Sequence, residues 1–332
     1  MKHDRRRSLI KIMGLSVFAL ATGISGHGTA LAAEEWRPKQ PIRLIVPYPP
    51  GGGTDVAARL MANSIQDLGG QPMVVENRAG ANGVIGANMA YAAAPDGTTL
   101  FFGVSDIIST TPHVNPKVIK FDPNNFPAVA PVGRGGYVLV SNASKPTQSV
   151  EEILKAVRAP NSTLSYGHWG AGSMSQMAME QFKMNAEIPQ LMEVPFGGSA
   201  ALLNAVLGDH VDYAFIPPGL AVSGGDKLRM YAASSAERIP MLPEVPTLRE
   251  LDFDTEAETL YGVFAPPGTP AHIIEYLNRE ILKVTKEKAF VDRLVELGYS
   301  ASPMSPAEMD ARVRAENKQW GEIVEKANLT ID

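Results

Sequence analysis

Two glycine-rich stretches are the parts of this sequence whose residue types could do chemistry. The first, "YPPGGGTD", covers residues 48–55, and the second, "HWGAGS", covers residues 168–173. Each follows an apolar run typical of a strand and precedes a run with helical spacing. Glycines at such a junction let a bound group approach the backbone N–H groups at the start of a helix, where an anion is favoured. Both stretches therefore indicate an anion-binding site.

A nucleotide phosphate fits the first stretch poorly. A Walker loop needs a lysine after its last glycine, whereas Thr54 and Asp55 follow Gly53 here. Asp55 would also compete with a phosphate for the positive end of the helix dipole. The glycines of "GANGVIGAN" (80–88) do not have the spacing of the dinucleotide-binding fingerprint. The sequence predicts no nucleotide and no cofactor.

Catalytic and metal sites are weakly represented. "GAGSMS" places Ser173 after a glycine but lacks the nucleophile-elbow spacing, and His168 is its nearest histidine in the sequence. A hydrolase of aromatic esters that uses this pair remains an alternative, and it predicts that Ser173→Ala abolishes turnover. No two histidines stand at a metal-ligating interval. The absence of cysteine excludes disulfides, thiolate nucleophiles and zinc–cysteine sites. We expect neither catalytic residues nor a metal.

A carboxylate is the anion that these junctions suit best. Each helix dipole contributes roughly 0.3–1 kcal/mol to binding it, so two junctions that face each other could hold a small acid without arginine. The alternative is that the glycines only make tight turns, and the presence of a second similar junction weakens that alternative.

The elements around these stretches follow an α/β pattern. From Ile42 onward, short β-rich runs alternate with amphipathic helical runs, which predicts mostly parallel sheets with helices on both faces. We expect strands at 42–48, 73–77, 98–104, 137–142, 163–168, 191–196, 211–217, 228–234 and within 259–270. We expect helices at 55–68, 82–93, 149–158, 173–185, 199–207, 271–286, 289–297 and 306–327, the first with Thr54 or Asp55 as its N-cap.

The length of the chain favours two lobes. The 332 residues exceed what one hydrophobic core usually serves. A chain that builds one lobe, crosses to a second and returns needs two linkers, which we place near 132–138 and 258–263. Two crossings make a hinge, and a hinge predicts a ligand cleft between the lobes.

The N-terminus is typical of an export signal. A basic segment at residues 5–7 precedes an apolar stretch at 12–24, and "ALA" at 30–32 matches a cleavage site. We therefore assign 1–32 as a signal peptide, with cleavage near Ala32–Ala33 and a periplasmic mature protein. "RRSLIK" also resembles a twin-arginine signal, so Sec and Tat export both remain open. The net charge of −5 and the lack of a basic cluster in the mature chain argue against a nucleic-acid partner.

A series of longer segments resembles one known family. They are "IRLIVPYPPGGGTDVAARLMA", "VVENRAGANGVIGANMAYAAAPDGTTL", "YGHWGAGSMSQMAME", "EVPFGGSAALLNAVLGDHVDYAF", "AASSAERIPMLPEVPTLREL", "YGVFAPPGTP" and "LGYSASPMSPAEMDARVRAENKQWGEIV". In this order they are similar to the periplasmic solute receptors of tripartite tricarboxylate transporters, also called Bug proteins. The resemblance implies an α/β, two-lobed periplasmic-binding-protein fold of the Venus-flytrap, type II-like kind. One lobe would comprise 36–135 plus 262–332, and the other 136–261.

The resemblance also implies a binding site and partners. The ligand would be held mainly by backbone groups and ordered water, lined by Tyr48, Pro50, Gly51, Gly52, Gly53, Thr54, Asp55, Ser105, Asp106, Trp169, Gly170, Ala171, Gly172, Ser173, Phe196 and Gly197. The partners would be a small carboxylate and the membrane subunits of a transporter, and we expect a monomer. A sensor subunit for a membrane signalling protein is the alternative.

The residues in these loops indicate which acids fit. No Lys or Arg lies in them, so mono- or dicarboxylates are favoured over polyanions such as citrate. Trp169, Tyr48 and Phe196 offer flat surfaces worth about 0.5–1.5 kcal/mol per aromatic contact beyond area burial, which favours an aromatic acid; Trp169 could instead pack under its loop. Asp106 could receive an ammonium or ring N–H, or cap the following turn, and we favour the cap.

Overall fold

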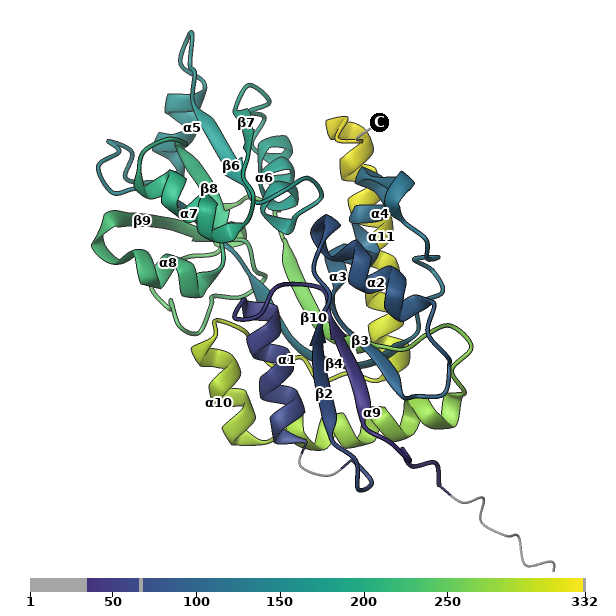
Figure 1. Ribbon diagram of the computed structural model, residues 1–332. Coiled ribbons are helices and arrows are strands. Elements are labelled where there is room, and N and C mark those ends of the chain that lie inside the picture. The colour runs from purple at the N-terminus through teal and green to yellow at the C-terminus, as the bar shows by residue number, and fades with distance from the viewer. Residues whose placement is uncertain (1–34, 66–67, 331–332) are drawn as a thin grey trace, which may run out of the picture. The chain divides into compact units, whose positions relative to one another are not determined.

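The computed structural model describes residues 35–65 and 68–330 (Figure 1). The signal-peptide assignment at 1–32 lies outside the described residues. All helices and strands belong to a compact unit that begins at Trp36. Within the described part of the chain, no helix combines the length and apolar character that a membrane span requires.

The first sheet has five strands in the order β2-β1-β3-β10-β4. Its strands are β1 (Ile42–Val46), β2 (Met73–Asn77), β3 (Thr99–Val104), β4 (Ala128–Gly136) and β10 (Glu258–Phe264). Strand β1 pairs in parallel with β2 and β3, and β10 pairs antiparallel with both β3 and β4. Four strands therefore run in one direction and β10 alone runs against them, as a mostly parallel sheet requires.

The second sheet repeats this arrangement in the order β7-β6-β8-β5-β9. Its strands are β5 (Val138–Asn142), β6 (Ser165–His168), β7 (Met192–Pro195), β8 (Tyr213–Ile216) and β9 (Leu228–Ala233). Strand β6 is parallel to β7 and β8, and β5 is antiparallel to β8 and β9. In each sheet the fourth strand in order, β10 or β5, runs against the others. Each of these two strands directly follows a crossing between the sheets.

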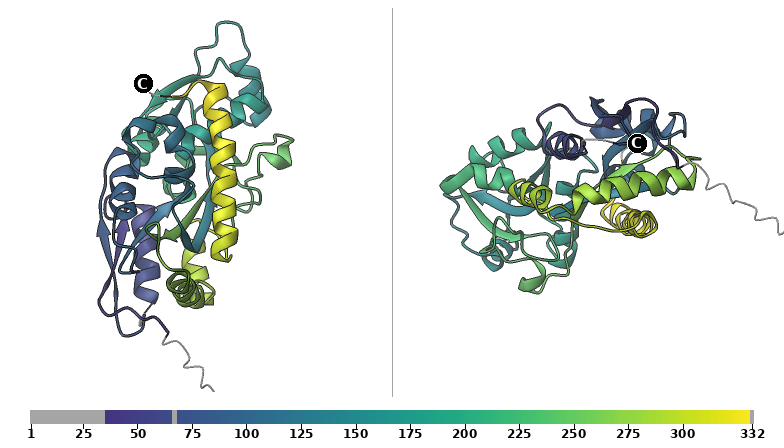
Figure 2. Two further views of the ribbon diagram at one scale, coloured as in Figure 1. Left: turned by 90° about the vertical axis from the view of Figure 1, so that its right-hand side faces the viewer. Right: turned by 90° about the horizontal axis from the view of Figure 1, so that it is seen from below.

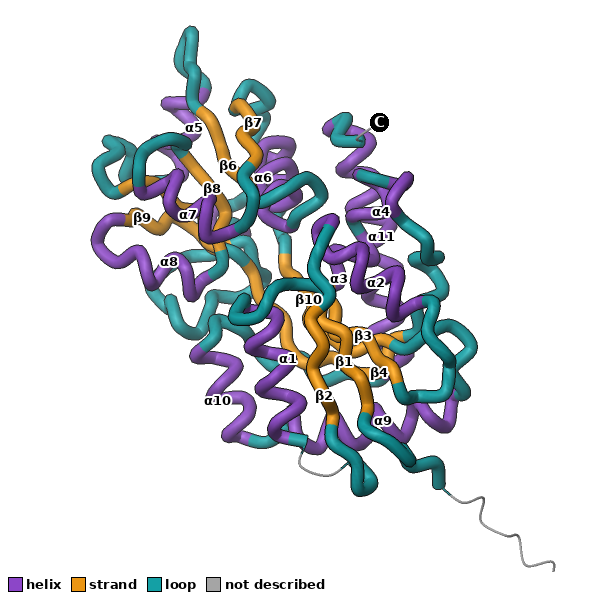
Figure 3. Tube along the Cα trace, viewed as in Figure 1, coloured by secondary structure: helices purple, strands orange, loops and turns teal. Residues whose placement is uncertain are grey.

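Helices flank both sheets (Figure 3). Those that pack on the first sheet include α1 (Gly53–Ser64), α2 (Val84–Tyr91), α9 (Ala271–Thr285) and α11 (Pro306–Ala327). Those that pack on the second include α6 (Met174–Asn185), α7 (Ser199–Leu207) and α8 (Pro218–Gly224). The remaining helices are α3 (Ser105–Ser109), α4 (Thr111–Val114), α5 (Val150–Val157) and α10 (Lys288–Glu296).

The two passages between the sheets lie side by side. Tyr137 is the single residue between β4 and β5, and the chain returns between β9 and β10. The hydroxyl of Ser234 accepts a hydrogen bond from the Tyr137 N–H at 2.9 Å and donates one to the carbonyl of Ala257 at 2.6 Å. The hydroxyls of Tyr137 and Thr259 are 2.5 Å apart. The first passage is therefore shorter than the expected linker at 132–138, most of which belongs to β4.

The hydrophobic interior comprises one cluster around the first sheet and two around the second. Helix α11, the long yellow helix of Figure 2, contributes to both regions. Met309 and Val313 are buried in the first cluster, whereas Trp320, Ile323 and Val324 are buried in a cluster of the second sheet. This one helix therefore packs against both halves.

Candidate functional site

The first glycine loop, residues 48–53, leads from β1 into α1 and leaves backbone donors exposed. Gly51, Gly52 and Gly53 are all exposed. The N-cap of α1 is Gly52, and no side chain caps this end. The first three N–H groups of a helix have no partner within the helix. Of the three residues at this end of α1, Gly53 is exposed, whereas Thr54 and Asp55 are buried.

The expectation that Thr54 or Asp55 is the N-cap was wrong, because Gly52 is the N-cap and the side chain of Asp55 bonds groups outside the start of the helix. Its carboxylate accepts hydrogen bonds from the Gly51 N–H at 2.8 Å, from Nε of Arg59 at 3.0 Å and from Nδ2 of Asn77 at 2.8 Å. Burial raises the pKa of Asp55, but these bonds outweigh it and hold the pKa below its usual range. Asp55 thus fixes the conformation of the loop through the Gly51 N–H and pairs with the nearby cation Arg59.

The second glycine loop, residues 169–173, leads from β6 into α6 and is held by side chains on both sides. The ring of His168 is buried, with Nδ1 2.9 Å from the carbonyl of Gly170 and Nε2 2.8 Å from a carboxylate oxygen of Glu193. The Gly172 N–H donates to Oε1 of Gln176 at 2.8 Å, and Nε2 of Gln176 donates to Glu193 at 2.9 Å. The hydrogen bond from His168 lowers the pKa of Glu193, which favours its charged form.

Ser173 caps α6 and does not face His168 as a nucleophile would. Its hydroxyl accepts from the N–H of Gln176 at 3.5 Å. Both ring nitrogens of His168 already have other partners, so these residues show no serine–histidine pair. The N–H groups of Met174 and Ser175, the first two of α6, have no partner within the helix, and both residues are buried.

A third strand-to-helix junction follows β7. The N–H of Phe196 donates to the carbonyl of His168 at 2.8 Å, which ties this junction to the second glycine loop. The ring of Phe196 packs against Gly167, where an added Cβ would come within 2.9 Å of it. Gly197 and Gly198 have open space around them and precede α7, whose N-terminus also lacks a side-chain cap.

Ser105 and Asp106 follow β3 and are both buried. The hydroxyl of Ser105 accepts from the N–H of Leu260 in β10 at 3.2 Å, so this residue supports the sheet. The interpretation of Asp106 as a cap was wrong, because the N-cap of α3 is Val104 and no side chain caps this helix; Asp106 lies in its first turn, and its carboxylate interacts with its own N–H and that of Ile107. Its Oδ1 atom, however, is buried without any hydrogen-bond partner. Burial, together with the charge of Glu316, raises the pKa of Asp106 to about 7.

Aromatic residues connect Asp106 with both glycine loops. Burial and the charge of Asp106 raise the pKa of Tyr48, in the first loop, and of Tyr137, at the first passage between the sheets. The ring of Tyr137 contacts that of Trp169 in the second loop, with centroids 5.3 Å apart. Trp169 therefore packs partly against Tyr137. Tyr48, Asp106, Tyr137 and Trp169 form one group that joins the two loops.

Sequence reasoning missed three tyrosines at this place. Tyr137 and Tyr261 interact electrostatically with Asp106, and the rings of Tyr261 and Tyr299 are 4.5 Å apart. The hydroxyl of Tyr299 lies so close to Gly53 that a Cβ there would come within 2.5 Å of it. Tyr137 and Tyr261 fall within the linkers expected from the sequence. Their position as aromatic residues in these linkers was the sequence feature that could have pointed to them as site residues.

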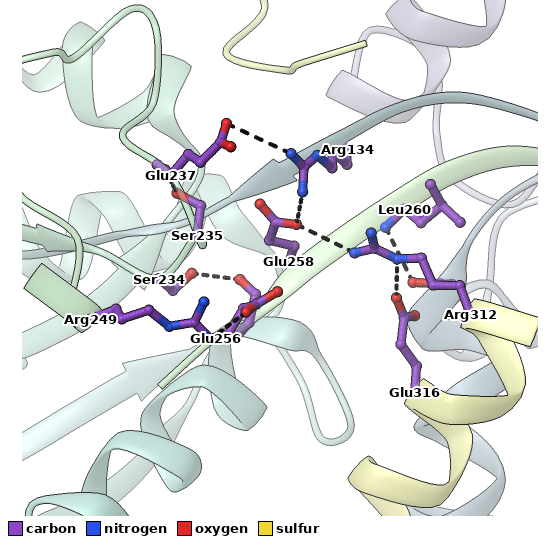
Figure 4. Close-up of polar contacts among 12 residues, drawn as sticks. Arg134, Ser234, Ser235, Glu237, Arg249, Glu256, Glu258, Leu260, Arg312 and Glu316 are labelled. Atoms are coloured by element: carbon purple, nitrogen blue, oxygen red, sulfur yellow. Dashed lines mark hydrogen bonds and ion pairs between the residues drawn. The ribbon is translucent and has the colours of Figure 1, made fainter. Parts of the chain in front are cut away.

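An ion-pair network links α11 with β4, with the start of β10 and with the segment that follows β9. Figure 4 shows Arg134 between Glu237 and Glu258, and Arg312 between Glu258 and Glu316. Arg312 is 3.3 Å from Glu258 and 2.9 Å from Glu316. Oε2 of Glu316 is buried without a hydrogen-bond partner. Both arginines are thus occupied by carboxylates.

The arrangement suits binding rather than chemistry. It offers backbone donors at the starts of α1, α6 and α7, aromatic surfaces and one buried carboxyl group. No Lys or Arg lies at 48–55, 105–106, 169–173 or 196–197. In the part of the chain that the structure describes, no group of three or more His, Asp or Glu side chains is placed to hold a metal ion.

Comparison with known proteins points to one family. A model described as "Tripartite tricarboxylate transporter family receptor" matches residues 57–329. BugT from Bordetella pertussis strain Tohama I is 31% identical over 325 residues, which cover 96% of this chain and 98% of BugT. The solved structure of Rpa4515 from R. palustris with adipate is 28% identical, has a TM-score of 0.78, and covers 88% of this chain and 98% of its own. MatC (Rpa3494) from Rhodopseudomonas palustris with bound malate is 28% identical, with a TM-score of 0.76, over 86% of this chain and 99% of its own.

Proposed function

The chain belongs to the receptor family of tripartite tricarboxylate transporters, and on that premise we propose that it captures a small organic acid in the periplasm and delivers it to the membrane subunits of such a transporter. A member of this family is a binding protein of a transporter and not an enzyme. The proposed ligand is a mono- or dicarboxylic acid, including an aromatic one. Malate and adipate, bound in the two related structures, belong to the same chemical class.

The observation that carries the proposal is the set of free backbone donors at three strand-to-helix junctions. The starts of α1 and α7 have no side-chain cap, and the first two N–H groups of α6, on buried residues, have no partner within the helix. Helix N-termini favour a carboxylate through these donors and through the dipole. The surrounding loops contain no Lys or Arg, so the donors would carry the recognition of the negative charge.

The paired passages between the sheets support a closing motion. One passage is a single residue, Tyr137, and the other runs beside it through Ser234 and Ala257. We propose that 36–135 plus 262–332 and 136–261 act as two lobes that rotate about these passages. A ligand that touches both glycine loops would then stabilise the closed arrangement. The receptor is proposed to act as a monomer after export by a Sec or Tat signal.

A thermal-shift screen of the mature protein tests this function. Mono-, di- and tricarboxylates, aromatic acids and amino acids are compared at equal concentration. A ligand that binds only the folded state adds RT ln(1 + [L]/Kd) to stability, about 2.7 kcal/mol at one hundred times Kd. We expect a rise in melting temperature of several degrees with at least one class of acid. A melting temperature that no carboxylate changes would refute the proposed function.

A further inference from the structure

The unpartnered oxygen of Asp106 is a polar group that the fold leaves unsatisfied beside the proposed carboxylate site. The residue is 5% exposed, and its Oδ1 atom has no hydrogen-bond partner. A buried polar atom without a partner costs about 1–3 kcal/mol, and more when charged. An ordered water, an ion or a ligand group can supply such a missing partner.

Four groups from different parts of the fold interact electrostatically with Asp106, and none of them is a cation. They are Tyr48 in the first glycine loop, Tyr137 at the first passage, Tyr261 in β10 and Glu316 in α11. A tyrosine hydroxyl is neutral at physiological pH, and Glu316 is a second acid. Among the described residues, no Lys or Arg forms a hydrogen bond or ion pair with Asp106.

The nearest cations are already committed to other acids. Arg312 is bonded to Glu316 and Glu258, and Arg134 to Glu258 (Figure 4). Among the buried acids, Asp106, Glu258 and Glu316 provide three carboxylates against these two guanidinium groups, and Arg134 also pairs with the exposed Glu237. When all are ionised, the acids outnumber the cations, and Asp106 is the buried acid of the three that neither arginine contacts.

Tyr48 connects Asp106 with the proposed site. Tyr137 and Tyr261 are almost fully buried, whereas Tyr48 is only partly buried and belongs to the exposed glycine loop. Tyr48 also interacts electrostatically with Asp106, so this carboxyl group lies near the loop that leads into α1. The same ligand could place a carboxylate on the donors and a second group on Asp106.

From this geometry we propose that the ligand is a zwitterion, with its carboxylate on the backbone donors of the glycine loops and a protonated amine on Asp106. The inference rests on the proposed function, since it names the class of acid that the same site takes. A protonated amine supplies the missing hydrogen-bond donor and cancels the excess negative charge. An acid that carries a second carboxylate at that place would instead meet Asp106 with like charge.

The test uses matched pairs of acids that differ only in the amine. The pairs are L-aspartate and succinate, L-glutamate and glutarate, and L-phenylalanine and 3-phenylpropionate, each titrated calorimetrically into the wild type and Asp106→Asn. We expect the wild type to bind one amino acid at least tenfold more tightly than its amine-free partner. In Asp106→Asn that preference disappears, because the amide keeps the shape and loses the charge. Asp310→Asn is the matched control, because Asp310 also accepts a backbone hydrogen bond, from the Ala128 N–H, and lies outside the site.

The outcomes separate the inference from the proposed function. If only amine-free acids bind, or if Asp106→Asn keeps the amine preference, the inference is overturned and the proposed function stands. If no acid binds, with or without an amine, the proposed function itself fails.

The wild type provides a second measurement that needs no variant. Asp106 must be ionised to hold an amine, and its pKa lies near 7, so the amine preference should fall at least tenfold between pH 8 and pH 5. A preference that is constant over this range overturns the inference even if Asp106→Asn does not fold.

Discussion

The two glycine loops share a strand-to-helix setting but are held in opposite ways. In the loop at 48–53, three exposed glycines enter α1 without a side-chain cap, and Asp55 bonds one N–H from within the helix. In the loop at 169–173, His168 and Gln176 bond the backbone on either side, and Ser173 caps α6. The first loop is open to solvent, whereas the second is braced before any ligand arrives.

This difference shows that the number of glycines does not give the number of free donors. The N–H of Gly51 is taken by Asp55 and that of Gly172 by Gln176. What remains for a ligand is decided by the side chain that caps each helix. Three N–H groups of α1 and two of α6 therefore remain without an intrahelical partner, and of these five residues Gly53 is exposed and the other four are buried.

The largest effect is expected from blocking the open loop. A Cβ at Gly52 would meet only the carbonyl of Pro49, at 3.7 Å, and its φ of −74° suits any residue. Gly52→Val should therefore fold normally but weaken carboxylate binding at least a hundredfold, about 2.7 kcal/mol, because the ligand loses its close approach to the backbone. Gly219→Val, at another glycine with open surroundings, is the control. Unchanged binding by Gly52→Val in calorimetry would show that the site is misplaced.

The next effect concerns the acid that lies between the loops. The folded state raises the pKa of Asp106 to about 7, so folded protein holds a proton between about pH 4 and 7 that unfolded protein releases. Stability from this group is therefore lost as the pH rises. At 1.36 kcal/mol per pKa unit, wild type should lose about 2–3 kcal/mol between pH 5 and pH 8 that Asp106→Asn keeps. Urea denaturation of the ligand-free proteins at both pH values measures these unfolding free energies. An equal change in unfolding free energy between pH 5 and pH 8 in the wild type and in Asp106→Asn would contradict the prediction.

Removing the side chain that holds the second glycine loop should lower the unfolding free energy by somewhat less than the change expected at Asp106. Gln176→Ala leaves the buried N–H of Gly172 and the carboxylate of Glu193 each without one partner. We expect a loss of about 2 kcal/mol in unfolding free energy and weaker ligand binding. Gln148→Ala is the matched control, since the Gln148 side chain bonds a carbonyl at the surface. Equal effects of the two changes on stability would mean that the second loop does not depend on its brace.

The smallest effect is expected at the cap of α6. The hydrogen bond from the Gln176 N–H to Ser173 is long, 3.5 Å, so Ser173→Ala should cost about 0.5–1 kcal/mol, the lower part of the range for N-caps. Ser149→Ala removes the corresponding cap of α5 and should cost as much without changing ligand affinity. Thermal unfolding with and without ligand compares the two, and a ligand affinity that falls equally in both would argue against a local role for Ser173.

Regular elements could be predicted where local pattern and burial agree. The expected ranges 73–77, 199–207 and 306–327 coincide with β2, α7 and α11. Strand β4 was missed because Pro131 and three glycines give its sequence the look of a loop. It becomes a strand through pairing with β10, which shifts register beside Pro131. Helices α3, α4 and α8 were missed because each is only four to seven residues long.

The detailed bonding of the candidate site could not be predicted, because its partners come from distant parts of the chain. Asp55 depends on Asn77 in the next strand, and Gln176 depends on Glu193 beyond the end of its helix. The environment of Asp106 is set by Tyr261 and Glu316, which follow it by more than 150 residues. A sequence pattern can name the loop, but not which of its groups are already occupied.

The position of β10 has a consequence for synthesis of the chain. Strand β10 lies between β3 and β4, yet it ends at Phe264, long after β4 has been made. The second sheet, by contrast, has all its strands once Ala233 has been made. The half that begins first is therefore finished last, because its pairings span the longest stretch of chain, and such pairings form slowly. Until then, a growing or translocating chain exposes the unpaired edges of β3 and β4, where chaperones that hold extended segments would bind.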